Sequence, residues 1–240
     1  MRTDRIKWLF FLLIMVIPDM SAAQTRLFQP GDSGVIATLD FLLISEHYHN
    51  NTFGVVRGSY THRGRWDVGL EYGNTDLKND RRGFAFFGKV AVLNPQPGDR
   101  WGLEARLRFS DQKSETNLPP VRGFFIPDYD RVRYRNLIPG LRGFYRNEEA
   151  SQVVGLGAFY RFRKYEVLTP ADEVLIGYDY DELGFDFGVH GRIWGAMTLS
   201  VEMAYSQYKS TTGDRWELST VWSVGVMFGR AADQGGKVHE

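Results

Sequence analysis

The sequence of 240 residues contains no cysteine, which fits an oxidising compartment managed without disulfides. It also carries no net charge, because 29 basic residues balance 29 acidic ones. A nucleic-acid-binding protein usually shows a basic excess or a basic stripe, and neither is evident, so no nucleic-acid partner is expected. After the N-terminus, no apolar run reaches the roughly 20 residues that a transmembrane helix needs.

The N-terminus has the pattern of a secretory signal peptide, which we predict to span residues 1–23. The basic segment MRTDRIK precedes the apolar run WLFFLLIMVIP, and DMSAA then supplies small residues before Gln24. The apolar run is too short for a membrane span and is followed by a cleavage site, as in secreted proteins. We therefore expect the chain to cross the inner membrane and lose this segment.

The rest of the chain repeats a two-residue alternation, the signature of β-strands with one apolar face. In RWELSTVWSVGVMFGR, Trp216, Trp222 and Phe228 share an apolar face, while Glu217 and Ser223 lie on the other. The alternation predicts ten strands, over residues 34–46, 53–62, 65–75, 83–93, 101–111, 131–146, 152–166, 174–189, 195–208 and 215–229.

The sixth of these segments changes parity. Val132 and Tyr134 share one face, but Leu137 and Leu141 continue on the other, and Pro139 lies between them. One extra residue in a strand would produce such a change, and proline is tolerated at such sites. The pattern therefore predicts a β-bulge near residues 136–139.

The alternation alone does not say whether the apolar face meets a protein core or lipid. Strand lengths near 10 residues, aromatic residues near the ends of the apolar rows, a glycine-rich opposite face with charges of both signs, and an even strand number favour lipid. The predicted fold class is all-β, an up-and-down antiparallel transmembrane β-barrel of about ten strands, with eight as the alternative. It would occupy residues 24–229, and residues 230–240 would form a periplasmic C-terminal tail.

The last predicted strand resembles the closing strand of bacterial outer-membrane β-barrel proteins. In that group an alternating apolar row ends in an aromatic residue, typically Phe, which the barrel-assembly machinery reads; Phe228 would take this role. The segment GRAADQGGKVHE follows it, whereas in the group the Phe is usually the last residue. The resemblance implies an outer-membrane location and contact with outer-membrane lipids. No cofactor is expected.

Arginines gather at one end of two neighbouring predicted strands. Arg131, Arg133 and Arg135 begin the sixth segment, and Arg161 and Arg163 come near the end of the seventh. We predict that all five point into the lumen and form salt bridges there, since small barrels fill their interiors with side chains. Two alternatives stay open, an anion-attracting mouth and, if the arginines reach the outside, a lipopolysaccharide phosphate site. The expected acidic partners in the lumen include Glu104, Asp179 and Asp186.

Two further segments contain weaker candidates. His47 and His49 have the spacing of two ligands on one strand face, although a solvated loop is the favoured interpretation and no metal is expected. The long connection 111–130 could present Phe124, Phe125 and Tyr129 to a ligand, since loops of this length are often functional.

These patterns favour a structural or surface-exposed protein with a largely filled lumen. The alternatives are a narrow pore for small solutes, including anionic ones, and a soluble periplasmic β-barrel that binds a ligand. Ten strands also resemble the omptin proteases, but the sequence lacks the Asp–His couple of that family in Asp-x-His spacing. His190 has no obvious serine partner for a lipid hydrolase, so no enzymatic activity is expected.

Overall fold

The computed structural model describes residues 33–46, 49–75, 81–93, 100–115, 131–147, 151–169, 171–194, 196–210 and 213–230. The described residues form ten β-strands, as the alternation predicted, and the eight-strand alternative is wrong. The strands are β1 (Ser33–Glu46), β2 (His49–His62), β3 (Trp66–Thr75), β4 (Arg81–Leu93), β5 (Trp101–Glu115), β6 (Arg131–Arg146), β7 (Gln152–Leu168), β8 (Val174–Trp194), β9 (Met197–Ser210) and β10 (Gly213–Arg230).

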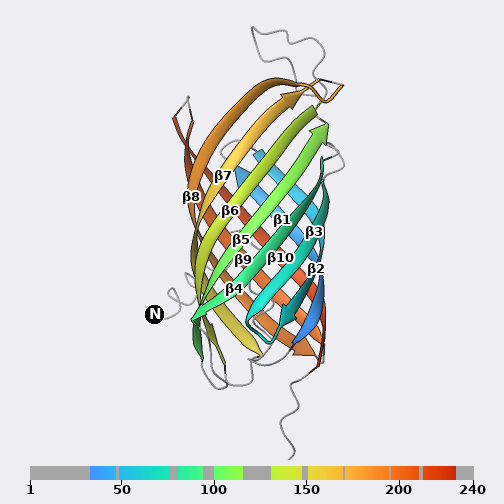
Figure 1. Ribbon diagram of the computed structural model, residues 1–240, viewed down its shortest axis with the longest axis vertical. Helices are drawn as coiled ribbons and strands as arrows, with labels where there is room; N and C mark the ends of the chain where they lie inside the picture. The colour runs from blue at the N-terminus through green and yellow to red at the C-terminus, as the bar shows by residue number, and fades with distance from the viewer. Residues whose placement is uncertain are drawn as a thin grey trace, which may run out of the picture.

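The sheet closes on itself. Each strand pairs antiparallel with its neighbours in sequence, and β1 also pairs with β10, from Ser33 opposite Arg230 to Glu46 opposite Glu217. Figure 1 shows the strands wrapping around the barrel at a steep tilt. Closure leaves no strand edge with unpaired backbone groups, which is a requirement for any sheet surrounded by lipid.

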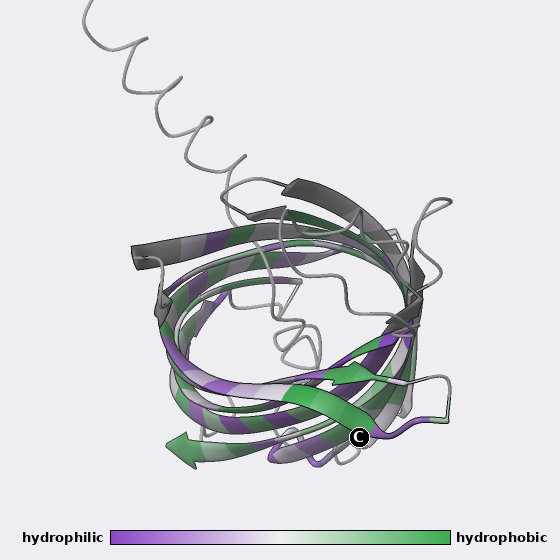
Figure 2. Cartoon of the chain, turned by 90° about the horizontal axis from the view of Figure 1, so that it is seen from above, coloured by the Kyte–Doolittle hydropathy of each residue, from purple (hydrophilic) through white to green (hydrophobic). Residues whose placement is uncertain are grey.

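The two faces of the wall differ sharply in polarity. On β7, for example, Leu156 points outward and is 66% exposed, whereas Arg161 points into the lumen and is 3% exposed. Bands of hydrophilic and hydrophobic residues therefore alternate along the strands in Figure 2. The same inside-out arrangement holds on β10, where Trp222 faces outward and Ser223 faces the lumen, as predicted.

Glycines on the inner wall make room for bulky side chains from the next strand. A Cβ atom on Gly69 would lie 2.2 Å from the ring of Phe87, its direct cross-strand partner. An aromatic ring over a glycine protects the exposed backbone and fixes the register of the two strands. The same cross-strand arrangement recurs at Gly102 with Phe144 and at Gly184 with Phe159.

The predicted bulge in β6 is absent. The pairing of β6 with β5 runs without a shift from Arg131 to Tyr145, and the pairing with β7 keeps one register on both sides of Pro139. Even-numbered residues of β6 point inward throughout. The apparent change of parity has another cause, because apolar residues such as Val132 and Ile138 fill the lumen while polar ones lie outside at the strand's start.

Candidate functional site: the lumen and the loop rim

The lumen is filled by charged side chains in matched numbers. Eight basic and eight acidic side chains of the described residues point inward, each at most 13% exposed, so the interior can be neutral overall. They are Arg57, Lys89, Arg106, Arg108, Arg142, Arg146, Arg161 and Arg163 against Asp40, Asp67, Glu71, Glu104, Glu182, Asp186, Glu202 and Glu217.

A central network crosses the lumen between β5, β6, β8 and β9. Arg106 donates hydrogen bonds to both carboxylate oxygens of Asp186, and Arg142 lies 3.3 Å from the same carboxylate. Arg142 also reaches Glu202, at 3.8 Å, and His190 lies 3.3 Å from Glu202. The side chains are at most 2% exposed, so the network is enclosed within the barrel.

Glycine on the inner wall is what allows this network to form. A Cβ atom on Gly188 would lie 2.2 Å from a terminal guanidinium nitrogen of Arg142 and 2.7 Å from the ring of His190. A Cβ atom on Gly157 would lie 2.8 Å from Asp186. The glycines of the inner face therefore leave the space that the arginine side chains occupy.

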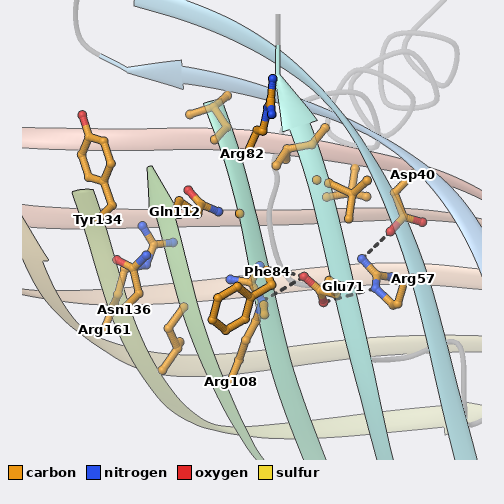
Figure 3. Close-up of a pocket in the computed structure, with 18 of the residues that line it drawn as sticks. Asp40, Arg57, Glu71, Arg82, Phe84, Arg108, Gln112, Tyr134, Asn136 and Arg161 are labelled. Carbon is orange, nitrogen blue, oxygen red and sulfur yellow. Dashed lines mark hydrogen bonds and ion pairs between the residues drawn. The ribbon is translucent and has the colours of Figure 1, made fainter. Parts of the chain in front are cut away.

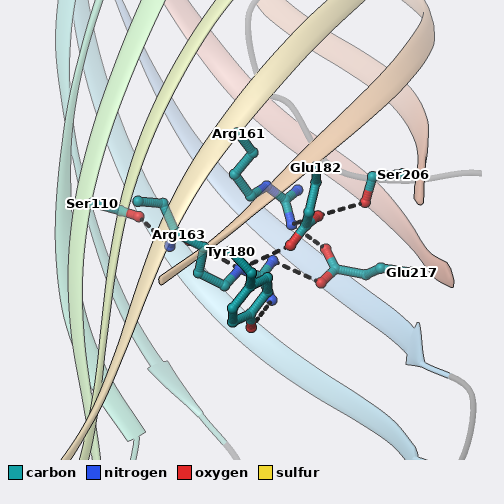
Figure 4. Close-up of polar contacts among 8 residues, drawn as sticks. Ser110, Arg161, Arg163, Tyr180, Glu182, Ser206 and Glu217 are labelled. Atoms are coloured by element: carbon teal, nitrogen blue, oxygen red, sulfur yellow. Dashed lines mark hydrogen bonds and ion pairs between the residues drawn. The ribbon is translucent and has the colours of Figure 1, made fainter. Parts of the chain in front are cut away.

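A second network lies nearer the end of the barrel where β5 ends and β6 begins, which we call the loop rim. Figure 4 shows Arg161 and Arg163 of β7 paired with Glu182 of β8 and Glu217 of β10. Arg161 approaches the two carboxylates at 3.0 and 2.7 Å, and Arg163 at 3.1 and 2.8 Å. Ser206 donates a further hydrogen bond to Glu182. Four reciprocal ion pairs thus tie together three strands that are not all neighbours.

A third network lines the opposite wall. Arg57 reaches Asp40 at 2.5 Å and Glu71 at 3.2 Å, and Arg108 donates to Glu71 at 2.8 Å (Figure 3). The cavity between this network and Arg161 is small, about 70 Å³. It has room for a few water molecules but not for a solute such as a sugar.

The loop-rim arginines of β6 do not join these networks. Arg131, Arg133 and Arg135 have odd numbers on a strand whose even residues point inward, so their side chains lie on the outer surface. The prediction that they point into the lumen is wrong for these three and right for Arg161 and Arg163. Strands β6 and β7 do bring all five to the same rim, but on opposite faces of the wall.

On the outer surface, the loop-rim arginines share a few carboxylates with two lysines. Arg133 pairs with Asp111, and Arg135 pairs with Glu166 at 2.5 Å. Lys164 also reaches Glu166, at 3.1 Å. In these pairs among the described residues, three basic side chains share two carboxylates.

Lys113 and Arg131 share one more carboxylate, that of Asp172 in the turn between β7 and β8. The distances are 3.1 Å from Lys113 and 3.5 Å from Arg131. The hydrogen bond from Lys113 lowers the pKa of the Asp172 carboxyl below its ordinary value, and the charge of Arg131 adds to the effect. Asp172 thus bridges two strands to the turn.

The acidic residues that pair with the lumenal arginines are only partly those predicted from the sequence. Asp186 does pair in the lumen, but with Arg106 and Arg142, and Asp179 lies on the outer face. The partners of Arg161 are Glu182 and Glu217, which are not among the partners expected from the sequence. The alternation of side chains along their strands predicts that both carboxylates point into the lumen. It does not predict that they lie beside these arginines.

The polarity of the two faces shows whether lipid or water surrounds the barrel. Large apolar side chains such as Phe41, Leu70 and Trp222 lie on the outer wall with 40% or more of their surface exposed, while paired charges fill the inside. A soluble barrel would have the opposite arrangement. The protein is a transmembrane β-barrel. Among the described residues no helix is long and apolar enough to cross a membrane.

Comparisons with known proteins find likeness in structure only. No family model matches the sequence, and no curated protein matches it. Neisserial surface protein A is 12% identical, with a TM-score of 0.38, over 82% of this chain and 96% of that chain. The translocator domain of the autotransporter NalP from Neisseria meningitidis is 12% identical, with a TM-score of 0.41, over 82% and 88%. The N-terminal β-barrel domain of Pseudomonas aeruginosa OprF is 11% identical, with a TM-score of 0.31, over 83% and 99%.

The remaining sequence candidates are only partly placed. Phe228 faces outward near the end of β10, is 61% exposed and pairs with Val35 of β1; its role as an assembly signal stays a prediction. His49 is the first residue of β2, and the described residues contain no group of three or more potential metal ligands. The other candidates, His47, Phe124, Phe125 and Tyr129, lie outside the described residues, as do the predicted signal peptide and residues 231–240 of the predicted tail. The first residue of that tail, Arg230, is the last residue of β10.

Proposed function

We propose that the protein is a surface-exposed structural barrel of a bacterial outer membrane whose lumen is sealed by its own side chains. The observation that carries this proposal is the central network, in which the side chains of Arg142 and Glu202 are 0% and 2% exposed. From this burial we infer that no continuous aqueous path runs past these groups. The protein would then act through the surface that it presents and not through solute transport.

The outer-membrane location is supported by three features. The chain begins with a signal-peptide pattern, single-chain bacterial outer-membrane barrels have even strand numbers, and both ends of this barrel wall lie at one rim. Short periplasmic turns and longer external loops are usual in such barrels. The longest connection, between β5 and β6, would place the loop rim outside the cell.

Cell fractionation tests the location. We expect the full chain, expressed in a Gram-negative host, to be found with outer membranes and to migrate differently on a gel before and after boiling. The closed hydrogen-bonded wall resists detergent at room temperature, and boiling unfolds it. A detergent-free periplasmic band with no shift would contradict the proposed location.

Conductance tests the sealed lumen. We expect the purified protein to give no stable single-channel current in a planar lipid bilayer, because the buried ion pairs leave no water path. An open porin inserted by the same procedure serves as the sensitivity control. A steady current carried by the native protein would instead support the alternative of a narrow pore.

The histidine considered for a lipid hydrolase, His190, is not accessible. His190 is 0% exposed and lies against Glu202 inside the lumen. A histidine in this position cannot reach a lipid substrate at the outer wall. We therefore propose a non-enzymatic role.

A further inference from the structure

Three basic residues stand side by side on the outer face of the loop rim. Arg82 of β4 is the direct cross-strand partner of Lys113 on β5, which in turn is the direct partner of Arg133 on β6. Neighbouring strands lie only about 4.8 Å apart, and like charges directly opposite each other destabilise a sheet. We call these three residues the cation row. Two of its members already pair with carboxylates, Lys113 with Asp172 and Arg133 with Asp111, and an anion that all three side chains contact would add to this neutralisation.

A groove on the outer wall runs along the cation row. It has a volume of about 470 Å³, and Arg131 lines it together with the three residues of the cation row. Asp111 is the one acidic side chain among the described residues that line it, and Tyr72 and Phe84 supply aromatic walls. The groove is therefore basic at the rim and apolar toward the middle of the barrel.

The groove also has a defined depth relative to the lipid-facing surface. An apolar row lies four residues along β4, β5 and β6 from the cation row and continues onto β7, and its members are direct cross-strand partners. Four strand residues span about 13 Å. Each side chain of the apolar row is 38% to 52% exposed. The apolar row consists of Phe86, Phe109, Leu137 and Phe162.

This order, from cations at the rim to aromatic and aliphatic side chains below, matches an amphipathic anion and not a soluble one. A phosphate has three oxygens that accept charge-assisted hydrogen bonds from arginine and lysine. Acyl chains attached to that phosphate-bearing headgroup would lie along the apolar row. Both parts of the ligand are satisfied only if it stands in the membrane beside the barrel.

We propose that the cation row and Arg131 bind the phosphate of a membrane lipid in the external leaflet, which in a Gram-negative outer membrane is the phosphorylated headgroup of lipopolysaccharide. The side chains of Arg131 and Arg133 are 33% and 30% exposed, so they can turn toward such a headgroup while keeping their carboxylate partners. The proposal rests on the proposed outer-membrane location and on the external placement of the loop rim.

The test compares lipid binding by the full-length folded barrel and a double variant, Lys113→Gln/Arg133→Gln. Binding of diphosphorylated lipid A to the detergent-solubilised protein would be titrated by native mass spectrometry, beside a phosphate-free glycolipid with the same acyl chains. We expect the native barrel to prefer the phosphorylated lipid by tenfold or more. The double variant should lose most of that preference, because each charge-assisted hydrogen bond that is lost weakens binding by roughly tenfold.

The matched control is Arg63→Gln/Arg65→Gln. These two exposed arginines lie in the turn between β2 and β3, at the opposite rim. Their replacement removes the same amount of charge as the double variant does. The control should bind like the native protein. Equal binding of both lipids by the native barrel, or equal loss in both double variants, would overturn the site. Displacement of lipid A by inorganic phosphate at the same concentration would overturn the assignment to a lipid.

Failure of this proposal can be told apart from failure of the proposed location. A heat-modifiable barrel in the outer-membrane fraction that shows no phosphate preference contradicts only the lipid site. A soluble periplasmic protein contradicts both. The gel shift of the Gln variants also verifies that each one folds before its binding is interpreted.

Discussion

Replacement of Asp186 by Asn is expected to destabilise the barrel by about 3–5 kcal/mol, the usual cost of breaking a buried ion pair by removing one partner. Asp186 receives hydrogen bonds from Arg106 and lies 3.3 Å from Arg142, and all three side chains are at most 2% exposed. Asparagine keeps the shape of the side chain but removes its charge. Two buried guanidinium groups would then lose the carboxylate between them.

The measurement is urea unfolding of the purified barrel in lipid vesicles, followed by tryptophan fluorescence. Asp179→Asn is the matched control, because it makes the same chemical change on the same strand, on the outer face near the loop rim. An exposed substitution of this kind normally changes stability by less than about 0.5 kcal/mol. Equal midpoints for the two variants would show that the central network contributes little to stability.

Replacement of Leu156 by Arg is expected to cost about 2–4 kcal/mol, as for a charge placed on the lipid face near the bilayer midplane. Leu156 lies on the outer wall of β7, is 66% exposed and has Gly143 and Phe187 as its cross-strand partners. Neither partner offers a carboxylate, so the guanidinium group would face lipid without a counter-charge. We also expect less of the variant to reach the outer membrane.

Gln152→Arg gives the matched control. Gln152 begins β7 on the same face as Leu156, so an arginine there would stand at the membrane boundary, where the cost falls to about 0–1 kcal/mol. Unfolding midpoints and the amount of heat-modifiable protein would be compared for the two variants. If both lose stability equally, the outer wall of β7 does not face the hydrocarbon core.

The number of strands, their approximate bounds and the direction of most side chains were predictable from the sequence. The reason is that successive side chains on a strand point to opposite faces, so the pattern is local and needs no knowledge of neighbours. Trp222 and Ser223 on β10 fall on the predicted faces, as do Leu156 and Arg161 on β7. The membrane environment followed from the same alternation together with strand length and aromatic placement.

β6 shows where local pattern was insufficient. At its start, Arg131, Arg133 and Arg135 point outward and Val132 points inward, which is the reverse of the polarity of the rest of the wall. Near the rim the outer surface leaves the hydrocarbon region, so charged residues are tolerated there and polarity no longer reports direction. Only the continuous register with β5 and β7 settles which way these arginines point.

The sequence by itself determined that the chain is a closed-barrel candidate with charges of both signs on its inner face. Only the tertiary structure decided which charges meet. Closure brings β10 beside β1, and the lumen lets Arg161 on β7 reach Glu217 on β10, 56 positions later in the chain. Such partners depend on the tilt and stagger of the whole wall, which no single strand encodes. The same dependence aligns Arg82, Lys113 and Arg133 into the cation row on the outer wall.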